Sequence, residues 1–411
     1  MENPKIRFKG FTKDWEQRKL GDLVDRVTRK NQDLVSELPL TISAQYGLID
    51  QNEFFDKRVA SKDVSGYYLI ENGEFAYNKS TSTDAPWGAI KRLDRYENGV
   101  LSTLYIVFGI KENNPVDSDF LVSYYSTNLW HKGIHEIAAE GARNHGLLNI
   151  APADFFETRL MIPQDIEEQK KIGKYFIELE ALITLHQRKC EQTKNLKKYM
   201  LQKMFPQNGA KVPEIRFDGF TYDWEQRKVS EITKFHKQGF YTTEEYDNSK
   251  KYYLLRGTDL TENKLVLKDT PKIDATEKDY DAFKTEIGDF LIVRSGTVGT
   301  YGIVDVDIPA IFGSYLIDFR FDMEQVTNEF FGYFYQSSLF KSQLNKIIQA
   351  SANTNINAEN IKSTVISLPS LNEQRRISEY LGNLDNLITL HQRKCDELKK
   401  MKKYMLQNMF I

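Results

Sequence analysis

The chain has 411 residues, of which 40% are apolar and 28% are charged, and its formal net charge is −2. This length is too great for one ordinary domain and predicts two or three, with enough apolar residues for a core in each. The balanced charge excludes the strongly basic composition of many small nucleic-acid-binding proteins, although a large protein can confine its positive charge to one face.

Targeting and redox signals are absent from the sequence. No apolar run approaches the roughly 18 residues that a membrane helix needs, and the opening letters MENPK lack the apolar core of a signal peptide. The two cysteines, Cys190 and Cys395, exclude a disulfide framework and favour a reducing compartment. We therefore expect a soluble protein of the cytoplasm that has no membrane partner.

The chain is an internal duplication, which is the most informative pattern in the sequence. Residues 4–19 (PKIRFKGFTKDWEQRK) recur as residues 213–228 (PEIRFDGFTYDWEQRK). Residues 182–190 (LITLHQRKC) recur unchanged as 387–395, and residues 198–202 (KYMLQ) recur as 403–407. Each half thus has nearly constant blocks around a variable body, as expected of a scaffold that presents two different binding heads.

The first repeated block ends in DWEQ, at residues 14–17 and 223–226. This pattern predicts the start of a short helix, with Asp14 and Asp223 as N-caps and the glutamine at the third helical position. The bodies that follow, near 20–160 and 229–366, combine aromatic and β-branched runs at 104–108, 290–293 and 316–319 with glycine-rich turns. The second also contains a helix-like run from Phe330 to Ile348. Both bodies therefore predict mixed α and β structure.

A long helix is predicted from about Ile166 to Phe205, because no proline or turn cluster interrupts it, and a second one matches it near the end of the chain. Residues that are apolar or small recur with coiled-coil spacing in both. In the first they are Ile172, Phe176, Leu179, Ile183, His186, Cys190, Thr193, Met200 and Met204, and in the second Ile377, Leu381, Leu384, Ile388, His391, Cys395, Leu398, Met405 and Met409.

The two coiled-coil seams should bury each other, and an antiparallel pair is favoured because each helix leads back to the first block of the other half. Some forty residues of helix span on the order of 60 Å, so we expect a stiff rod with a globular body at each end. Residues 206–213 (PQNGAKVP) predict the break between the halves. The lysine-rich faces around Lys194, Lys197, Lys198 and Lys203 are expected to be solvated exteriors rather than DNA contacts.

Motifs for catalysis are missing. The sequence contains no phosphate-binding loop with Walker spacing, and its glycine-rich segment 296–302 is better explained as a turn in a sheet. It also lacks the NPPY or DPPY segment with which adenine methyltransferases hold a flipped base. A self-sufficient nuclease or methylase is therefore disfavoured.

On paper, the two His and two Cys of a structural zinc site are supplied by His186, Cys190, His391 and Cys395. If antiparallel helices cross near the histidines, the cysteines run apart, to roughly 12 Å by helical rise. We therefore expect no metal, and interpret these residues as small polar groups that fix the register of the seam.

The repeated blocks resemble those of a known family. A PxIRFxGFxxxW opening occurs twice, and each variable body is followed by a proline and a helix start that contains Glu168-Gln169 or Glu373-Gln374. This arrangement, which covers essentially the whole chain, resembles the specificity subunits of type I restriction-modification systems.

The resemblance implies a DNA-reading subunit without catalytic activity of its own. Each variable body would be a target recognition domain that reads one half of a bipartite target in double-stranded DNA, and the helices would set the separation of the halves. The partners would be two methyltransferase subunits and two restriction/translocase subunits. S-adenosylmethionine, ATP and Mg²⁺ would bind to those partners, and no cofactor would bind to this chain.

The expected fold is α+β, with two mixed α/β target recognition domains separated by two long antiparallel coiled-coil helices and related by an internal pseudo-twofold duplication. The first target recognition domain would occupy residues 1–163 and the first spacer helix 164–205. The second domain would occupy 206–369 and the second helix 370–411.

Candidate DNA-binding residues are Arg, Lys, Asn, Ser, Thr and His side chains on loops, since these read base edges and phosphates. In the first body they are Asn78, Lys79, Ser80 and Thr81, together with Arg143, Asn144 and His145; in the second they are Arg256, Arg294, Ser295, Thr297, Ser351, Asn353 and Asn355. Any single one is equally well explained as a solvated loop residue. As a set they fall on two loops at corresponding places in both halves, which favours the functional interpretation.

One alternative stays open from the sequence. The near-neutral charge also suits a non-catalytic adaptor or architectural protein whose two heads bind other proteins instead of DNA.

Overall fold

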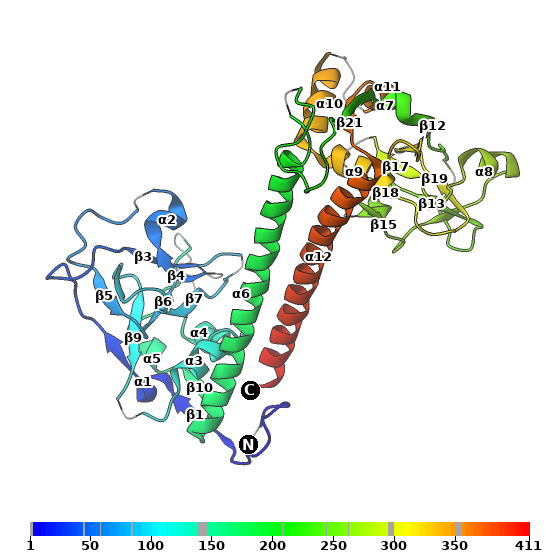
Figure 1. Ribbon diagram of the computed structural model, residues 1–411. Helices are drawn as coiled ribbons and strands as arrows, with labels where there is room; N and C mark the ends of the chain where they lie inside the picture. Colours follow the sequence, from blue (N-terminus) through cyan, green and yellow to red (C-terminus); the bar gives the residue numbers. More distant parts are fainter. Residues whose placement is uncertain are drawn as a thin grey trace. The chain divides into compact units, whose positions relative to one another are not determined.

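The computed structural model describes residues 3–43, 46–57, 59–83, 85–112, 114–138, 146–207, 209–243, 245–261, 263–294, 300–350 and 356–411, apart from the side chains of 348–350. The chain divides into two compact units. The first unit comprises Met1–Gln187 and Arg393–Ile411, and the second comprises Arg188–Gln392. Each unit contains one globular body, the start of one long helix and the end of the other (Figure 1).

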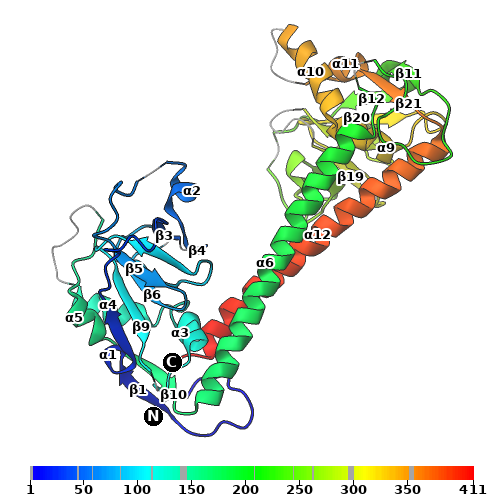
Figure 2. The same cartoon turned by 60° about the vertical axis from the view of Figure 1, so that its left-hand side comes forward.

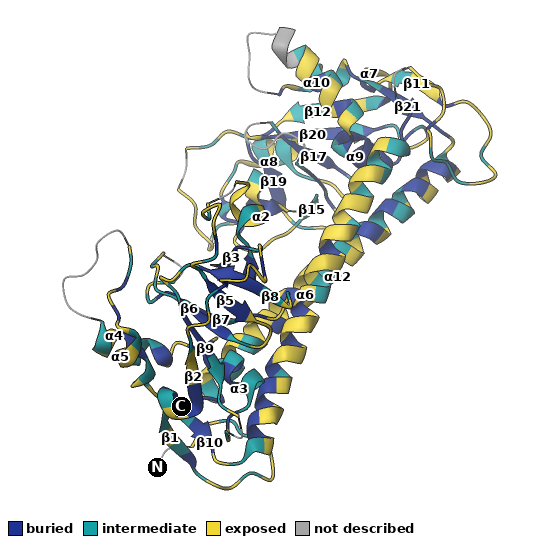
Figure 3. Cartoon of the chain, turned by 90° about the vertical axis from the view of Figure 1, so that its left-hand side faces the viewer, coloured by how far each residue is buried: buried dark blue, intermediate teal, exposed yellow. Residues whose placement is uncertain are grey.

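The long helices are α6 (Ile166–Lys203) and α12 (Leu371–Asn408), each of 38 residues. In the first unit, Leu179 and Ile183 of α6 form a buried cluster with Cys395 and Leu398 of α12. The start of α6 therefore packs on the end of α12, and the expected antiparallel pairing is confirmed. Figure 3 shows buried stripes on both helices and exposed residues on their outer faces.

In the second unit, the end of α6 packs on the start of α12. Lys197 forms an ion pair with Asp385 at 2.6 Å, and the Cys190 thiol lies 3.8 Å from the carbonyl oxygen of Ile388. Lys197 is thus largely buried, so the expectation that it belongs to a solvated exterior is wrong. Lys203 forms an ion pair with Glu214.

The body of the first unit is built on a four-stranded antiparallel sheet with the order β2-β9-β6-β7. Its strands are β2 (Val24–Val27), β9 (Ile106–Ile110), β6 (Phe75–Asn78) and β7 (Ala89–Arg92). Antiparallel pairs flank it: β1 (Trp15–Lys19) with β10 (Arg159–Pro163), β3 (Leu40–Ser43) with β4 (Gly47–Asp50), and β5 (Tyr68–Glu71) with β8 (Asn98–Leu101).

Short helices connect and cover these strands in the first unit: α1 (Leu20–Leu23), α2 (Gln51–Phe55), α3 (Ser118–Tyr124), α4 (Trp130–Ile137) and α5 (Pro152–Phe156). Helix α3 lies beside the start of α6 and the end of α12 (Figure 2). There Phe120 contacts Phe410, with ring centroids 5.5 Å apart. Phe410 therefore belongs to the core of a body that starts about 400 residues earlier in the sequence.

The body of the second unit repeats the same sheet order, as β12-β20-β17-β18. Its strands are β12 (Thr233–Gln238), β20 (Leu316–Phe321), β17 (Phe290–Val293) and β18 (Tyr301–Ile303). The remaining strands are β11 (Glu225–Lys228) paired with β21 (Val365–Leu368), β13 (Tyr252–Leu255) between β16 (Lys272–Ile273) and β19 (Ala310–Phe312), and β14 (Leu260–Thr261) paired with β15 (Lys264–Leu265). The duplication seen in the sequence is thus also a duplication of the four-stranded sheet and of the strand pair that precedes each long helix, whereas the remaining strands are arranged differently in the two bodies.

The helices of the second body are α7 (Val229–Ile232), α8 (Glu277–Phe283), α9 (Asn328–Gln336), α10 (Ser338–Ala350) and α11 (Ala358–Lys362), with a 3-10 turn, η1 (Gly257–Asp259). The expected single run from Phe330 to Ile348 is therefore two helices. The break falls at Ser337, which is extended and whose hydroxyl donates to the Phe334 carbonyl at 2.6 Å. This bond satisfies a carbonyl at the end of α9 and stops the helix.

The predicted helix starts at 14–17 and 223–226 are wrong, because Trp15–Lys19 and Glu225–Lys228 are strands β1 and β11. Each pairs with the strand that precedes a long helix. The Asp14 carboxylate accepts a hydrogen bond from Asn3 at 2.9 Å instead of capping a helix. Pairing with a distant strand overrides the local capping pattern here.

The arginine of the first repeated block and the glutamate at each long-helix start form the same ion pair in both units. Arg7 donates to both oxygens of Glu168, at 2.6 and 2.7 Å, and Arg216 donates to both oxygens of Glu373, at 2.7 and 2.8 Å. Both glutamates are buried. Bidentate pairs of this kind are among the stronger charged hydrogen bonds in proteins.

The neighbouring glutamine is fully buried and hydrogen-bonded in the same way in both units. The Gln169 side chain accepts from the backbone N–H of Asp117 at 2.9 Å and donates to the carbonyls of Pro115 and Pro163. The Gln374 side chain accepts from the N–H of Thr327 at 2.9 Å and donates to two carbonyls in the same manner. The glutamines thus tie α3 and α9, which Asp117 and Thr327 cap, to the long helices.

Asp318 on β20 predicts an unusual pH dependence of stability. It is fully buried, neither of its oxygens has a hydrogen-bond partner among the described residues, and the Arg320 Nε lies 3.6 Å away, beyond hydrogen-bond range. Burial, assisted by Asp289, raises the pKa of Asp318 to about 8. The pKa of an aspartate in an unfolded chain is about 4. Between pH 4 and pH 8 the folded chain therefore keeps the Asp318 proton and the unfolded chain loses it, so the free energy of unfolding falls as the pH rises through this range.

Asp318→Asn is therefore expected to leave stability nearly unchanged at pH 4 and to raise it by up to about 5 kcal/mol at pH 8, since the pKa rises by about four on folding and each pH unit between the two values is worth about 1.4 kcal/mol. Urea unfolding at both pH values measures the difference. A variant less stable than the parent at pH 8 contradicts this assignment.

Among the described ranges, none of the helices is both long and apolar enough to cross a membrane.

Candidate nucleic-acid interface

In the first body, the segment of candidate DNA-binding residues 78–81 lies at the end of β6, beside residues 146–148, which follow the other candidate segment. The backbone N–H of Leu148 donates to the Lys79 carbonyl at 3.0 Å, and the Thr81 N–H donates to the Gly146 carbonyl at 2.7 Å. Ser80 bridges to Leu147 as well. Arg143, Asn144 and His145 lie outside the described residues, but they directly precede Gly146 in the chain. The loop after β6 is therefore fixed beside the end of the segment that carries them.

The side chains of this loop differ in what they offer. The Asn78 oxygen accepts from the Ser80 N–H at 3.0 Å, which shapes the turn. The Lys79 ammonium lies 3.5 Å from the Ile150 carbonyl, and burial lowers the pKa of Lys79. The Ser80 side chain is exposed, whereas the Thr81 hydroxyl donates to the Gly146 carbonyl at 3.0 Å. Lys79 is thus a partly desolvated cation, which suits a phosphate or an acceptor on a base edge.

The second body brings corresponding segments together at the end of β17. The Arg294 N–H donates to the Tyr315 carbonyl at 3.0 Å, and the Arg294 carbonyl accepts from the N–H of Ile356 at 3.2 Å. Ser295, Thr297, Ser351, Asn353 and Asn355 lie outside the described residues and flank this contact in the chain. The Arg294 side chain is half-buried and has no ion-pair or hydrogen-bond partner within the described residues.

Arg256 is placed differently. Its Nε lies 3.3 Å from Asp259 and its Nη2 donates to the Asp269 carbonyl at 3.0 Å, so its guanidinium holds the start of η1. The following residue, Gly257, lies against Val293, next to Arg294. Arg256 is thus close to the candidate site but already engaged.

The sequence alone did not single out two exposed apolar residues that lie near the candidate sites, one in each body. Tyr315, whose carbonyl accepts from Arg294, is exposed, and so is Leu104. Leu104 lies in the turn before β9, whose residue Ile106 pairs with Tyr77, two residues before Lys79. A sequence pattern could have indicated both residues: each is a bulky apolar residue in a turn before a strand, at 102–105 and 313–315. Such side chains can contact the methyl group of thymine.

The possible zinc ligands do not form a cluster. No group of three or more potential ligands suited to a metal occurs in the described part of the chain. Cys190 lies near Ile388 and Gln392, whereas Cys395 packs with Leu179 and Ile183 in the other unit. Both thiols therefore lie in the seam between the helices.

Comparisons with known proteins agree with this architecture. The family model described as "Type I restriction modification DNA specificity domain" matches residues 222–400. The specificity subunit of the type I restriction enzyme MjaVIII of Methanocaldococcus jannaschii is 23% identical over 408 residues, covering 96% of this chain and 91% of that protein. The putative MjaX specificity subunit of the same organism is 21% identical over 426 residues, covering 96% of this chain and 92% of that protein.

Solved structures share the fold over the full chain. The S subunit of the type I restriction-modification system of M. genitalium superposes with a TM-score of 0.63 at 14% identity, covering 100% of this chain and 99% of that one. A chain from a study of complex assembly and conformational transition in a type I system gives a TM-score of 0.51 at 16% identity, covering 97% and 98%.

Proposed function

Because the chain belongs to the specificity subunits of type I restriction-modification systems, we propose that each of its two globular bodies reads one half of a bipartite DNA sequence. It is the DNA-recognition subunit of such a complex and not a catalytic one. The target recognition domains are assigned to residues 1–163 and 206–369, joined by the spacer helices 164–205 and 370–411. The chain is expected to act in the cytoplasm, on the double-stranded DNA that carries its target sequence.

One observation carries this assignment most directly. Both bodies build the same sheet order and place a cationic residue, Lys79 or Arg294, directly after the third strand in that order. In both, the backbone of that residue is hydrogen-bonded to a second loop segment. Corresponding loops with different side chains are what two readers of different half-sites require.

The partners are proposed to be two methyltransferase subunits, with two restriction subunits joining them. The long helices expose apolar residues on faces away from their seam, at positions 205 apart in the duplication: Leu182, Leu196 and Tyr199 on α6, and Leu387, Met401 and Tyr404 on α12. Exposed apolar stripes of this kind mark protein interfaces. Two equivalent stripes support two copies of the same partner.

Sequencing of methylated adenines tests the function. In cells that carry this chain with its methyltransferase subunit, we expect modified adenines in two half-sites at a fixed separation. Cells with the methyltransferase subunit alone serve as the control and should lack this pattern. Methylation that follows a single continuous motif contradicts the proposal.

Arg294→Ala is expected to weaken specific DNA binding by about 1–3 kcal/mol, because a cation next to a base edge is lost. The loss should appear with duplexes that carry the half-site of the second body and vanish when that half-site is scrambled. Arg143→Ala should show the converse dependence on the other half-site. Fluorescence anisotropy at fixed salt measures both, and equal losses on both half-sites contradict the assignment.

A further inference from the structure

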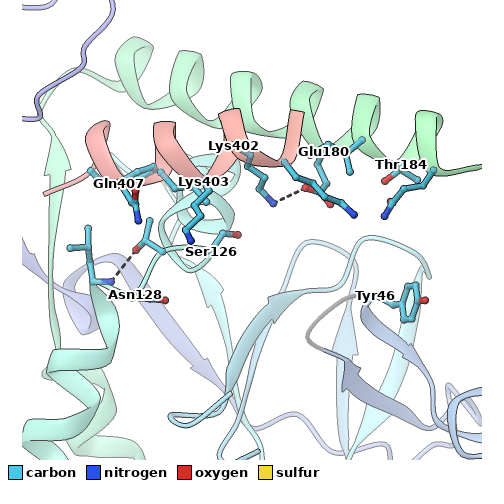
Figure 4. Close-up of a pocket in the computed structure, with 15 residues that line it drawn as sticks. Tyr46, Ser126, Asn128, Glu180, Thr184, Lys402, Lys403 and Gln407 are labelled. Atoms are coloured by element: carbon cyan, nitrogen blue, oxygen red, sulfur yellow. Dashed lines mark hydrogen bonds and ion pairs between the residues drawn. The ribbon is translucent and has the colours of Figure 1, made fainter. Parts of the chain in front are cut away.

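A groove of about 870 Å³ opens in the first unit between the globular body and the paired helices (Figure 4). One wall is the junction of α3 and α4 at 126–129, with Tyr46 from the turn between β3 and β4. The helical walls are Glu180, Ile183, Thr184 and Gln187 of α6 and Lys399, Lys402, Lys403, Leu406, Gln407 and Phe410 of α12.

The corresponding place in the second unit can be found from the helix caps. Asp117 and Thr327 cap α3 and α9, and their N–H groups are bonded to equivalent glutamines. Counting from these caps matches Thr127 with Ser337, and both hydroxyls donate to the carbonyl three residues before them, at 2.7 and 2.6 Å. The same count matches Ser123 with Tyr333 and Ser126 with Gln336.

Large side chains fill that place in the second unit. The Lys197 ammonium donates to Gln336 at 2.8 Å and pairs with Asp385 at 2.6 Å, and it lies 5.4 Å from the centre of the Tyr333 ring. The Tyr333 hydroxyl donates to the second oxygen of Asp385 at 3.0 Å. A groove at this position is therefore closed by a tyrosine and a glutamine.

The first unit has the equivalent ion pair but lacks large side chains at the positions of Tyr333 and Gln336. Lys402 pairs with Glu180 at 2.6 Å, as Lys197 does with Asp385. The matching residues of α3 and its C-terminal end are Ser123 and Ser126, whose hydroxyls donate to the carbonyls of Asp119 and Val122, one turn earlier, at 2.9 Å each. The groove thus results from serines in place of Tyr333 and Gln336.

The groove carries an excess of positive charge. Lys399 and Lys403 are exposed and have no ion-pair partner among the described residues, and Glu180 is the one carboxylate in the lining. Lys399 and Lys403 thus add two positive charges to a lining whose one carboxylate, Glu180, already pairs with Lys402.

The remaining lining suits a peptide. Ile183, Leu406 and Phe410 form an apolar floor, and the amides of Asn128, Gln187 and Gln407 can pair with backbone N–H and C=O groups. A DNA duplex is disfavoured, because its backbone would lie beside Glu180 and leave the apolar floor unused.

We propose that this groove binds an acidic, partly apolar segment of a partner subunit in an extended conformation. The inference rests on the proposed function, since that function supplies the partner subunits. The segment binds to the first unit and not to the corresponding place in the second, so a chain with duplicated topology gains one asymmetric attachment point.

Photo-crosslinking in the assembled complex tests the proposal. p-Benzoylphenylalanine is placed at Thr184 in the groove and, as a control, at Thr389, the same residue of the repeat in the second unit. We expect the probe at 184, in the complex with methyltransferase and restriction subunits, to crosslink to a peptide rich in Asp and Glu, identified by mass spectrometry. The probe at 389 should not crosslink to that peptide.

Charge-reversal variants of the groove lysines test whether positive charge is needed for the crosslink. Lys399→Glu with Lys403→Glu should reduce the crosslink from position 184 about tenfold, which corresponds to about 1.4 kcal/mol. Lys194→Glu with Lys198→Glu, the matching lysines of the second unit, should leave it unchanged. Ser126→Gln, which introduces the filling residue of the second unit, should also reduce the crosslink.

A crosslink to DNA or to a segment without carboxylates, no crosslink in an assembled complex, or no response to Lys399→Glu with Lys403→Glu overturns the groove assignment alone. Assembly and sequence-specific methylation by the unaltered chain are measured first. Their failure contradicts the proposed function itself, and the groove proposal with it.

Discussion

Glu373→Ala is expected to lower the free energy of unfolding of the second unit by about 3–5 kcal/mol. The buried Glu373 carboxylate accepts two hydrogen bonds from Arg216 and one from the Trp224 indole at 3.3 Å. Its removal leaves a mostly buried guanidinium without a counter-charge and a buried indole N–H without an acceptor. Breaking a buried pair from one side is costly for this reason.

Urea denaturation, followed by circular dichroism, measures this effect. Glu379→Ala is the matched control, because Glu379 lies on the same helix and pairs with Arg376 at 3.3 Å, but both side chains are exposed. We expect the control to cost less than about 1 kcal/mol. Similar costs for the two variants contradict a structural role for the Arg216–Glu373 pair. Glu168→Ala should act in the same way on the first unit.

Exchange of residues 20–158 for the corresponding body of another specificity subunit is expected to change one half of the DNA target completely and leave the other half as it was. The exchanged segment runs from α1 to the residue before β10, and it contains all the candidate DNA-binding residues of the first body. The retained parts include β1, β10 and the Arg7–Glu168 pair. The second body has its own core and is not altered.

Sequencing of methylated adenines with the exchanged chain measures the outcome. The reciprocal exchange of residues 229–364, between β11 and β21, is the control and should change the other half of the target. Changes in both halves from a single exchange would show that the bodies do not read independently.

The repeated letters of the sequence predicted most of the fold, and the contacts show why. Arg7 and Glu168, or Arg216 and Glu373, recur because each unit uses the same ion pair to attach its first block to a long helix. The coiled-coil spacing predicted which face of each long helix is buried, because apolar periodicity determines that face. The antiparallel direction followed from the connectivity, since each helix leads back to the first block of the other half.

The sequence could not reveal features that depend on distant partners. DWEQ has the local pattern of a capped helix, yet Trp15 pairs with Pro163 in a sheet, and no local rule contains that partner. The groove also depends on distant partners. Nothing in the sequence near Ser123 and Ser126 predicts it, because their equivalence to Tyr333 and Gln336 is visible only in the folded chain. Tyr315 was overlooked because exposure beside Arg294 is a property of the folded chain.

The backbone N–H of Ile6 donates to the Asn408 carbonyl at 2.9 Å, and that of Ile215 donates to the Lys203 carbonyl at 3.0 Å. The two junctions are alike, although the peptide chain runs through the second and not through the first. The same backbone contact thus holds a first repeated block to the last turn of a long helix whether the two lie about twelve residues apart along the chain or about four hundred.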